Sequence, residues 1–358
     1  MTLDRSIALL LLAAACRTDP APAPPPSGAS SPVSNPPEEA AASTGRVAPA
    51  AAASTDTEAP EATEAPAGAP PAGAPDAAPT LPDGRPILPC GDVPEDMACV
   101  PGGPFVRGSD DGPPDTRPKE TVHLQTFWID KYEVTVADYR ACVAQRRCPK
   151  AGPRYIGFDE PSMPITGVSW FDARAYCRAH GKDLPTEAQW EKAARGEHGA
   201  LYPWGDAPAT CERAILKDHR GRGCGRKKPR TKPEKGRPWP VGSRPPGVYG
   251  LYDMVGNSWE WVLDWYTTSY ADCGDACRGV DPKGPCDGAV PCKGVRRKVV
   301  RGGSWYWPAD PYNTAIYRRA HVPSNEPFHH FGFRCAKTLD EPASDGAPAE
   351  PTAAPATE

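Results

Sequence analysis

The sequence predicts one irregular α+β domain with little regular secondary structure, held together by disulfides. Three observations favour this class. Helix-start signals stand among short, interrupted strands, the 48 prolines of the 358 residues crowd toward the two ends, and 13 cysteines are present. The compact middle of the chain, roughly 240 residues, is long enough to bury one core. Helices and strands do not alternate along it as they do in a parallel α/β sheet.

Strand signals open the folded stretch. Residues 100–108 are typical of a strand broken by Pro and Gly, and residues 122–129 alternate like a half-buried strand. Three helices follow, each predicted by a capping box, in which a Ser or Thr precedes an Asp or Gln by three positions. The boxes are Thr135 with Asp138, Ser169 with Asp172, and Thr186 with Gln189. Gly181 and Gly196 mark the ends of the second and third helices.

Residues 1–16 are predicted to be a bacterial lipoprotein signal peptide. After Arg5, an apolar run at 7–15 leads to Cys16, and this run is too short to span a bilayer. We therefore expect an exported protein of the outer membrane or periplasm, anchored to a membrane by lipid on Cys16. An ordinary cleaved signal and a misassigned start are the alternatives. If Cys16 carries lipid, twelve cysteines remain, an even number suited to disulfides in an oxidising compartment.

Composition divides the rest of the chain into three parts. Residues 17–88 are rich in Ala, Pro, Glu, Ser and Thr, which predicts a disordered tether. Residues 89–338 form the folded domain, and residues 339–358 repeat the tether composition as a disordered tail. The net charge of −4 gives no case for a nucleic-acid partner. A basic run at 213–237 is interpreted as a solvated insertion loop, with contact to anionic lipid, a glycan or an acidic partner as the alternative.

Six cysteines are close enough in sequence to form local disulfides. The expected pairs are Cys90 with Cys99, Cys142 with Cys148, and Cys211 with Cys224. Cys273, Cys277, Cys286 and Cys292 lie in a Gly- and Pro-rich excursion, and their pairing stays open. Their Cys-x3-Cys and Cys-x5-Cys spacings fit structural zinc poorly, so disulfides are favoured.

Residues 301–336 are the most unusual stretch. They open with Arg-Gly-Gly-Ser-Trp, and the two glycines permit a left-handed turn or a close backbone approach. Aromatic and cationic side chains then follow densely, at Trp305, Tyr306, Trp307, Tyr312, Tyr317, Arg318, Arg319 and His321. Such a set is typical of a groove that grips a peptide or ligand. The alternative is a core segment whose aromatic side chains are simply buried.

A second candidate site lies in the loop at 249–261. Asp253 and Glu260 supply carboxylates, and Gly256 and Ser258 lie between them with carbonyl groups available. Hard oxygen ligands gathered from one irregular loop suit calcium. Ordinary exposed carboxylates are the alternative.

Seven segments occur in the order found in the formylglycine-generating enzyme, or sulfatase-modifying factor, family, which this chain resembles over nearly all of its folded region. They are residues 128–135, 164–170, 181–195, 202–206, 250–261, 301–305 and 332–336. The resemblance implies an irregular fold related to C-type lectins and a disulfide between Cys177 and Cys335. It also implies a structural calcium site and a substrate groove. The calcium site is matched by Asp253, Glu260 and the carbonyls of Gly256 and Ser258. The substrate groove is matched by Trp259 and Ser304.

Enzymes of this family oxidise a sulfatase cysteine to formylglycine with O₂ and copper(I), which two thiolates hold. Counting three and eight residues past Ser304 leads to Trp307 and Tyr312, and no cysteine lies between Cys292 and Cys335. Copper(I) requires soft ligands, and neither an indole nor a phenol replaces a thiolate. We therefore expect no copper and no catalytic residues of the family reaction, and we assign Trp307 and Tyr312 to the groove.

The sequence accordingly predicts a membrane-tethered, non-oxidase binding or scaffold lipoprotein of the cell envelope, with an envelope protein, peptide or glycan as partner. Two alternatives stay open: an oxidase acting on a protein cysteine through a rearranged site, and a different metal-dependent oxidase on the same fold. A metal centre built from His321, His329 and His330 is conceivable. Groove or surface histidines are the simpler interpretation.

Overall fold

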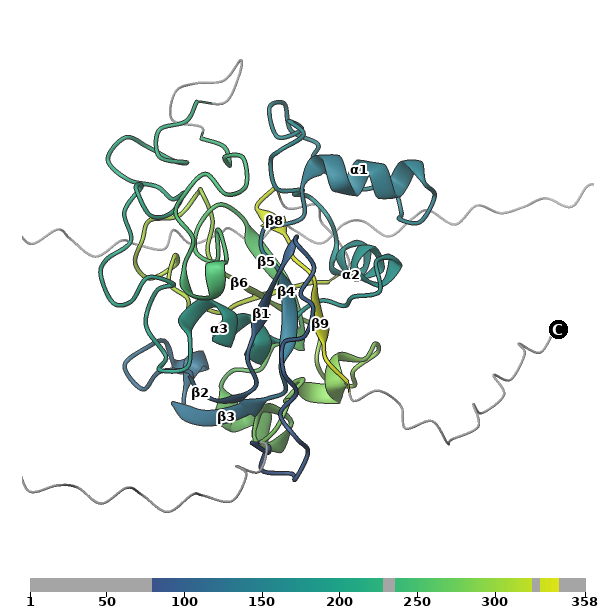
Figure 1. Ribbon diagram of the computed structural model, residues 1–358. Helices are drawn as coiled ribbons and strands as arrows, with labels where there is room; N and C mark the ends of the chain where they lie inside the picture. Colours follow the sequence, from purple (N-terminus) through teal and green to yellow (C-terminus); the bar gives the residue numbers. More distant parts are fainter. Residues whose placement is uncertain (1–78, 228–235, 324–328, 341–358) are drawn as a thin grey trace, which may run out of the picture. The chain divides into compact units, whose positions relative to one another are not determined.

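The computed structural model describes residues 79–227, 236–323 and 329–340 (Figure 1). Cys16 and the predicted tail beyond residue 340 lie outside these ranges, so the lipoprotein and tail assignments stay predictions. In the part that the structure describes, no helix is both long enough and apolar enough to cross a bilayer.

The described strands form three small sheets. One has the order β1-β4-β9, one pairs β2 with β3, and one has the order β7-β6-β5-β8. The strands of the first two sheets are β1 (Met97–Val100), β4 (Phe127–Asp130), β9 (Ala336–Thr338), β2 (Gly103–Arg107) and β3 (Glu120–Leu124). Those of the third are β5 (Trp259–Trp265), β6 (Lys298–Arg301), β7 (Arg319–His321) and β8 (Phe331–Gly332). The mixed, irregular α+β class predicted from the sequence is confirmed.

The single strand predicted over 122–129 is wrong, because this stretch contributes to two strands of different sheets, β3 and β4. Gln125 and Thr126 separate them. The Gln125 N–H donates to the carboxylate of Asp281 (2.7 Å), and the Thr126 N–H donates to the Gln125 side-chain oxygen (2.8 Å). Side chains thus satisfy the two backbone donors, and the ladder is interrupted there.

The three predicted helices are confirmed, each with its capping box. They are α1 (Val136–Ala144), α2 (Trp170–Ala179) and α3 (Glu187–Arg195). Gly181 and Gly196 both have φ of +69° where the second and third helices end. The remaining helical turns are α4 (Tyr270–Cys273) and the 3₁₀ turns Pro114–Thr116, Val248–Gly250, Gly274–Cys277 and Pro285–Gly288.

Six disulfides hold the described residues. They are Cys90–Cys99, Cys142–Cys148, Cys177–Cys335, Cys211–Cys224, Cys273–Cys277 and Cys286–Cys292. The expected local pairs and the pair implied by the family resemblance are confirmed. The four cysteines left open also form disulfides, which takes them out of consideration as zinc ligands. Every cysteine in the three described ranges is therefore oxidised.

The end of the predicted tether belongs to the folded unit. Leu81 is 2% exposed, the Leu88 N–H donates to Gln125 (2.9 Å), and Arg85 pairs with Asp281 (2.7 Å). Residues 81–88 thus contact the domain, through partners that composition alone does not reveal.

Candidate functional site

The loop that follows β6 begins at a buried anchor, Arg301. This guanidinium is fully buried, pairs with Glu187 (2.6 Å) and Glu191 (2.9 Å) of α3, and donates to the carbonyl of Ala315 (2.6 Å). Removing one partner of a buried pair leaves the other charge without compensation, so such a contact resists displacement. The loop therefore starts from a fixed point in the core.

Two glycines turn the chain directly after this anchor. Gly302 and Gly303 have φ of +92° and +77°, and a Cβ on Gly303 would collide with the side chain of Asn313. Asn313 Nδ2 in turn donates to the carbonyls of Trp307 and Pro308, at 2.7 Å each. The sequence-based expectation of a left-handed turn and close approach is thus met, and it closes the loop on itself.

The closed loop borders a cleft of about 530 Å³, called here the aromatic cleft. Its described lining residues are Tyr155, Phe158, Arg222, Gly236, Trp305, Tyr306, Trp307, Arg319, His329 and His330. They come from the loop after α1, the basic insertion, the loop after β6, β7 and the stretch before β8. A cleft of this volume is in the usual range for ligand pockets.

A continuous row of rings forms one wall of the aromatic cleft and the layer behind it. Trp305 and Tyr306 have ring centroids 5.4 Å apart, and Tyr306 and Trp307 have theirs 5.1 Å apart. The row continues from Trp307 to Tyr312 (4.7 Å) and on to Tyr317 (5.2 Å). Ring pairs at these distances stabilise one another beyond the burial of area, so the wall is preformed.

The charges that face the aromatic cleft are positive. The Arg222 guanidinium carbon lies 3.7 Å from the Tyr306 ring centroid, and that of Arg319 lies 5.6 Å from the ring centroid of Trp307. Burial, reinforced by neighbouring positive groups, lowers the pKa of His330 to about 2, so this imidazole is neutral at neutral pH. No carboxylate stands among the described lining residues. The cleft therefore favours a ligand that carries an anionic or acceptor group beside an apolar one.

Two buried donors in the lining lack acceptors. The indole nitrogens of Trp305 and Trp307 are inaccessible to solvent and make no hydrogen bond within the described part of the chain. An unsatisfied buried donor costs on the order of 1–3 kcal/mol.

The four predicted groove residues lie at different depths. Trp307 lines the aromatic cleft, and Tyr312 stacks against it from behind. Trp259 and Ser304 are fully buried, and Trp259 contacts Tyr317 with ring centroids 5.7 Å apart. The structure thus brings the four residues into one neighbourhood, with Trp307 alone among them in the described lining.

The two positions predicted to correspond to the family's copper ligands hold packed rings. Trp307 and Tyr312 are tilted by 31° with respect to each other at a centroid distance of 4.7 Å. All cysteines within the described ranges are in disulfides, so no thiol from these ranges reaches the pair. The neighbourhood contains π-faces and indole donors instead of soft sulfur ligands.

The predicted calcium loop contains a buried carboxylate, that of Asp253, on a residue whose backbone is in the left-handed region. Asp253 has φ of +56°, and its Oδ2 accepts the N–H of Gly242 (2.7 Å). Its Oδ1 is buried and accepts no hydrogen bond within the described ranges. Burial raises the pKa of Asp253 to about 6, against the opposing effects of the Gly242 N–H and Arg334. An orphaned carboxylate oxygen in this position fits a cation.

Glu260, the other predicted carboxylate ligand, is already paired. Arg334 donates to both of its oxygens (2.7 and 2.8 Å), and Trp190 Nε1 donates to Oε2 (2.8 Å). Burial and the charges of Asp253 and Glu260 raise the pKa of Glu133 well above its usual value. Within the described ranges, no group of three or more His, Cys, Asp or Glu side chains is arranged so that it could hold a metal ion. The fit to calcium therefore rests on Asp253 and backbone carbonyls.

The three histidines considered for a metal centre are not brought together. His329 and His330 are adjacent, with ring centroids 4.1 Å apart, and both line the aromatic cleft. His321 packs instead against Phe331 (4.5 Å) and Trp261 (5.9 Å). His329 and His330 therefore agree with the simpler interpretation, in which they are histidines of the groove.

The basic insertion is partly tied to the domain. Arg226 pairs with Glu160 at 3.0 Å, and Arg237 pairs with the same carboxylate. Arg222 reaches the aromatic cleft, where it covers Tyr306. Residues 228–235 of the insertion lie outside the described ranges. Its interpretation as a solvated loop is therefore wrong for Arg222, Arg226 and Arg237, for which the domain supplies aromatic and acidic partners.

Sequence reasoning missed most of the lining that lies outside residues 301–336. Tyr155 and Phe158 come from a loop with no motif, and Arg222 was hidden in a basic run whose other members have different partners. The spacing of cations along the insertion carries no signal that separates Arg222 from its neighbours.

The fold and the cleft define a disulfide-held α+β scaffold that presents an aromatic, positively charged binding site. Residues 90–339 match the model of the sulfatase-modifying factor enzyme 1-like domain. The chain belongs to the sulfatase-modifying factor, or formylglycine-generating enzyme, family.

Three similar proteins place the chain within this family. The formylglycine-generating enzyme of Thermomonospora curvata is 31% identical over 305 residues, covering 68% of this chain and 94% of that protein. The mouse protein named inactive C-alpha-formylglycine-generating enzyme 2 is 28% identical, covering 70% of this chain and 88% of its own length. The structure of PvdO from Pseudomonas aeruginosa aligns with a TM-score of 0.53 at 25% identity, covering 68% of this chain and 94% of that one.

Proposed function

We propose that this protein is a non-oxidase binding protein of the bacterial cell envelope, and that its aromatic cleft holds a segment of an envelope protein, a peptide or a glycan. The observation that carries the proposal is the packed pair Trp307 and Tyr312 at the positions of the family's copper thiolates. Because the cysteines of the described ranges are all oxidised, a rearranged soft-ligand site has no thiol to draw on there.

The chemistry of the cleft supports a ligand with an apolar group next to a carboxylate or carbonyl. Its wall offers Trp305, Tyr306 and Trp307 for stacking, and Arg222 and Arg319 supply positive charge. Rigid aromatic and arginine side chains are also the residue types that dominate binding energies at interfaces. The name of the mouse relative describes an inactive enzyme, which supports a non-oxidase role for the scaffold in this family.

We further propose the location and the ion that go with this role. A lipid on Cys16, which lies outside the described residues, would hold the domain at a membrane through the proline-rich segment. A structural calcium ion would be held by Asp253 and the carbonyls of Gly256 and Ser258. Such an ion would supply the positive charge that the Asp253 Oδ1 lacks.

A capture experiment tests the binding proposal. The immobilised full chain is incubated with envelope extract from the source bacterium, alongside the double variant Tyr306→Ala and Trp307→Ala. We expect a retained partner whose recovery falls by at least about tenfold in the double variant, because a hot-spot aromatic residue contributes about 2 kcal/mol or more and about 1.4 kcal/mol is already a factor of ten in affinity.

The control for this experiment removes two exposed apolar side chains elsewhere, Tyr132→Ala and Val290→Ala, which are 38% and 45% exposed in the native chain. Recovery by the control variant should equal that of the unmodified chain. Equal recovery by the cleft variant, or no partner above the empty support, would contradict the proposal.

Calcium removal should lower the thermal stability of the full chain. A ligand that binds only the folded state stabilises it by mass action, and at saturating calcium we expect the melting temperature to fall by about 5 °C on adding excess chelator. Differential scanning calorimetry of the unmodified chain, Asp253→Ala and the exposed-site control Asp92→Ala measures this. Asp253→Ala should lose the calcium response and the control should keep it. Identical melting curves with and without chelator would remove the calcium assignment.

A further inference from the structure

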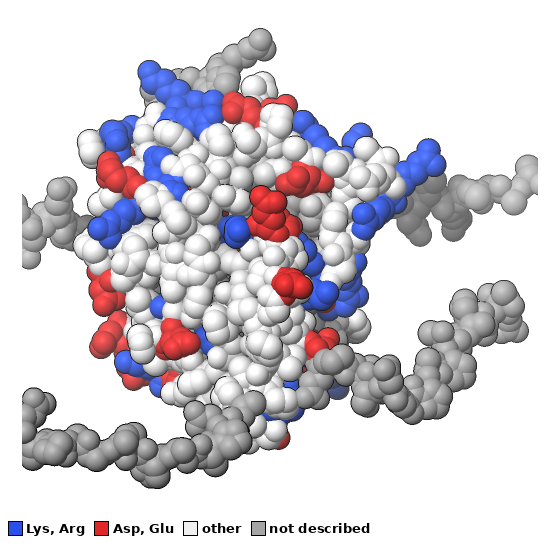
Figure 2. Space-filling view, in the orientation of Figure 1, with Lys and Arg blue, Asp and Glu red and all other residues white. Residues whose placement is uncertain are grey.

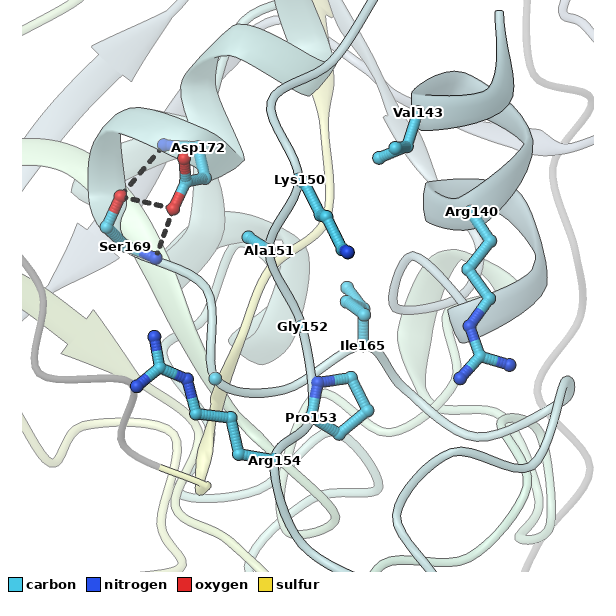
Figure 3. A pocket seen from close by; sticks show the side chains of 11 residues that line it. Arg140, Val143, Lys150, Ala151, Gly152, Pro153, Arg154, Ile165, Ser169 and Asp172 are labelled. Carbon is cyan, nitrogen blue, oxygen red and sulfur yellow. Dashed lines mark hydrogen bonds between the residues drawn. The ribbon is translucent and has the colours of Figure 1, made fainter.

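A second cleft of about 680 Å³ lies between α1 and the start of α2 (Figure 3). Figure 3 shows Arg140 on α1 at one side, Ser169 and Asp172 at the start of α2 on the other, and the ammonium group of Lys150 between them, with Arg154 at the rim. None of these residues lines the aromatic cleft. We call this second site the cationic cleft.

The cationic cleft has an excess of uncompensated positive charge. Lys150 and Arg154 make no ion pair or side-chain hydrogen bond within the described ranges, and both are exposed. Arg140 donates one hydrogen bond to the carbonyl of Asp159 (3.2 Å) and lies 3.9 Å from the Asp159 carboxylate. Both side chains are more than half exposed, and such ion pairs contribute little. The only carboxylate in the described lining, Asp172, is held by the backbone N–H (3.0 Å) and hydroxyl (2.6 Å) of Ser169. Figure 2 shows several Lys and Arg side chains, with Asp and Glu side chains among them, on the face that carries α1.

The floor of the cationic cleft is aliphatic. Val143, Ala151, Pro153 and Ile165 form it, and no aromatic side chain belongs to the described lining. Sugars and nucleobases are usually gripped by stacking on rings, so this lining favours an anion with an aliphatic part. The cleft is also much larger than a single phosphate group.

Exposed apolar side chains continue beside the lining in sequence. Ile156, two residues past the rim residue Arg154, is 61% exposed, and Phe171, in the first turn of α2, is 43% exposed. Cations next to exposed apolar and aromatic side chains are typical of surfaces that lie at a lipid headgroup layer. An acidic peptide would use the cations but not this apolar surface.

From this combination we infer that the cationic cleft binds the headgroup of an anionic glycerophospholipid. Its phosphate lies among Arg140, Lys150 and Arg154, and its glycerol and first methylene groups lie against Val143 and Ile165. The site orients the domain on a membrane surface, and it does not depend on what the aromatic cleft holds.

Isothermal titration of a water-soluble lipid into the full chain tests this inference. The chain carries Cys16→Ser, so that no anchor lipid competes, and the probe is dihexanoyl phosphatidylglycerol below its micelle concentration. We expect saturable binding that weakens by roughly tenfold or more when Arg140, Lys150 and Arg154 are all replaced by Gln. Each Lys or Arg near an anionic lipid contributes a factor of about five.

A matched variant removes the same charges elsewhere: Lys293→Gln, Arg296→Gln and Arg297→Gln, all exposed in the native chain. It should bind the lipid as the unmodified chain does, and melting curves confirm that both triple variants are folded. If lipid binding weakens equally in the two triple variants, the effect is due to net charge alone and the inference is overturned. Equally tight binding of glycerol 3-phosphate, of dihexanoyl phosphatidylcholine or of hexaglutamate would also overturn it, in favour of a phosphate, an uncharged-lipid or an acidic-peptide site.

Discussion

Copper(I) titrated anaerobically into the full chain is expected to remain with a competing colorimetric chelator. Monovalent copper is held by thiolates or other soft ligands. The positions predicted to correspond to the family's thiolates carry Trp307 and Tyr312, whose ring centroids lie 4.7 Å apart. The cysteines of the described ranges are unavailable, because all are in disulfides. Incubation with a sulfatase-motif peptide, copper and O₂ should therefore leave the peptide thiol unchanged in mass.

A gain-of-binding variant makes this result interpretable. Trp307→Cys with Tyr312→Cys restores sulfur at both positions, while Asn313 still ties the loop through the carbonyl of residue 307. If the scaffold is otherwise intact, the double variant should take up about one copper(I) ion per chain. Copper uptake and aldehyde formation by the unmodified chain would refute the non-oxidase proposal. If neither protein binds copper, this chain differs from the copper-binding relatives at further positions of the scaffold, and the unmodified chain is still a non-oxidase.

Arg301→Ala should be the most destabilising single substitution on the scaffold beneath the aromatic cleft. Arg301 is fully buried between Glu187 and Glu191, and removing one partner of a buried pair typically costs roughly 3–5 kcal/mol. Urea unfolding of the full chain measures the loss in free energy. Arg85→Ala serves as the matched control, since its pair with Asp281 is solvent-accessible and should contribute about 1 kcal/mol or less. A loss at Arg301 no larger than at Arg85 would contradict the anchoring role.

Acid should remove the same stabilisation. Burial alone would raise the pKa of Glu191, but Arg301, Arg195 and the N–H of Gly108 outweigh it and lower the pKa to about 2. A carboxyl whose folded-state pKa is depressed stabilises the fold above its unfolded pKa of about 4.3, and this contribution is lost as the pH falls toward 2. The difference in unfolding free energy between the unmodified chain and Arg301→Ala should therefore shrink between about pH 4.5 and pH 2.

Local signals in the sequence determined the features that depend on near neighbours. The boxes beginning at Thr135, Ser169 and Thr186 predicted all three longer helices, because a capping side chain and its backbone donor lie within one turn. Closely spaced cysteines paired as expected for the same reason. The absence of sulfur at Trp307 and Tyr312 also follows from the amino-acid sequence alone, since it needs only an ordered count from Ser304.

The tertiary structure alone determined which residues from distant parts of the chain contact these local features. The sequence around Gln125 does not predict that its backbone N–H donates to the carboxylate of Asp281, which interrupts the strand. The lining of the aromatic cleft is likewise non-local, because Tyr155 and Arg222 reach Trp305 only through packing of segments far apart in the chain. The carboxylates Glu187 and Glu191 of α3 are buried because Arg301 and Arg318 reach them from distant segments and neutralise their charge. Residue type and short spacing set local conformation, whereas burial and partners depend on contacts that only the closed fold creates.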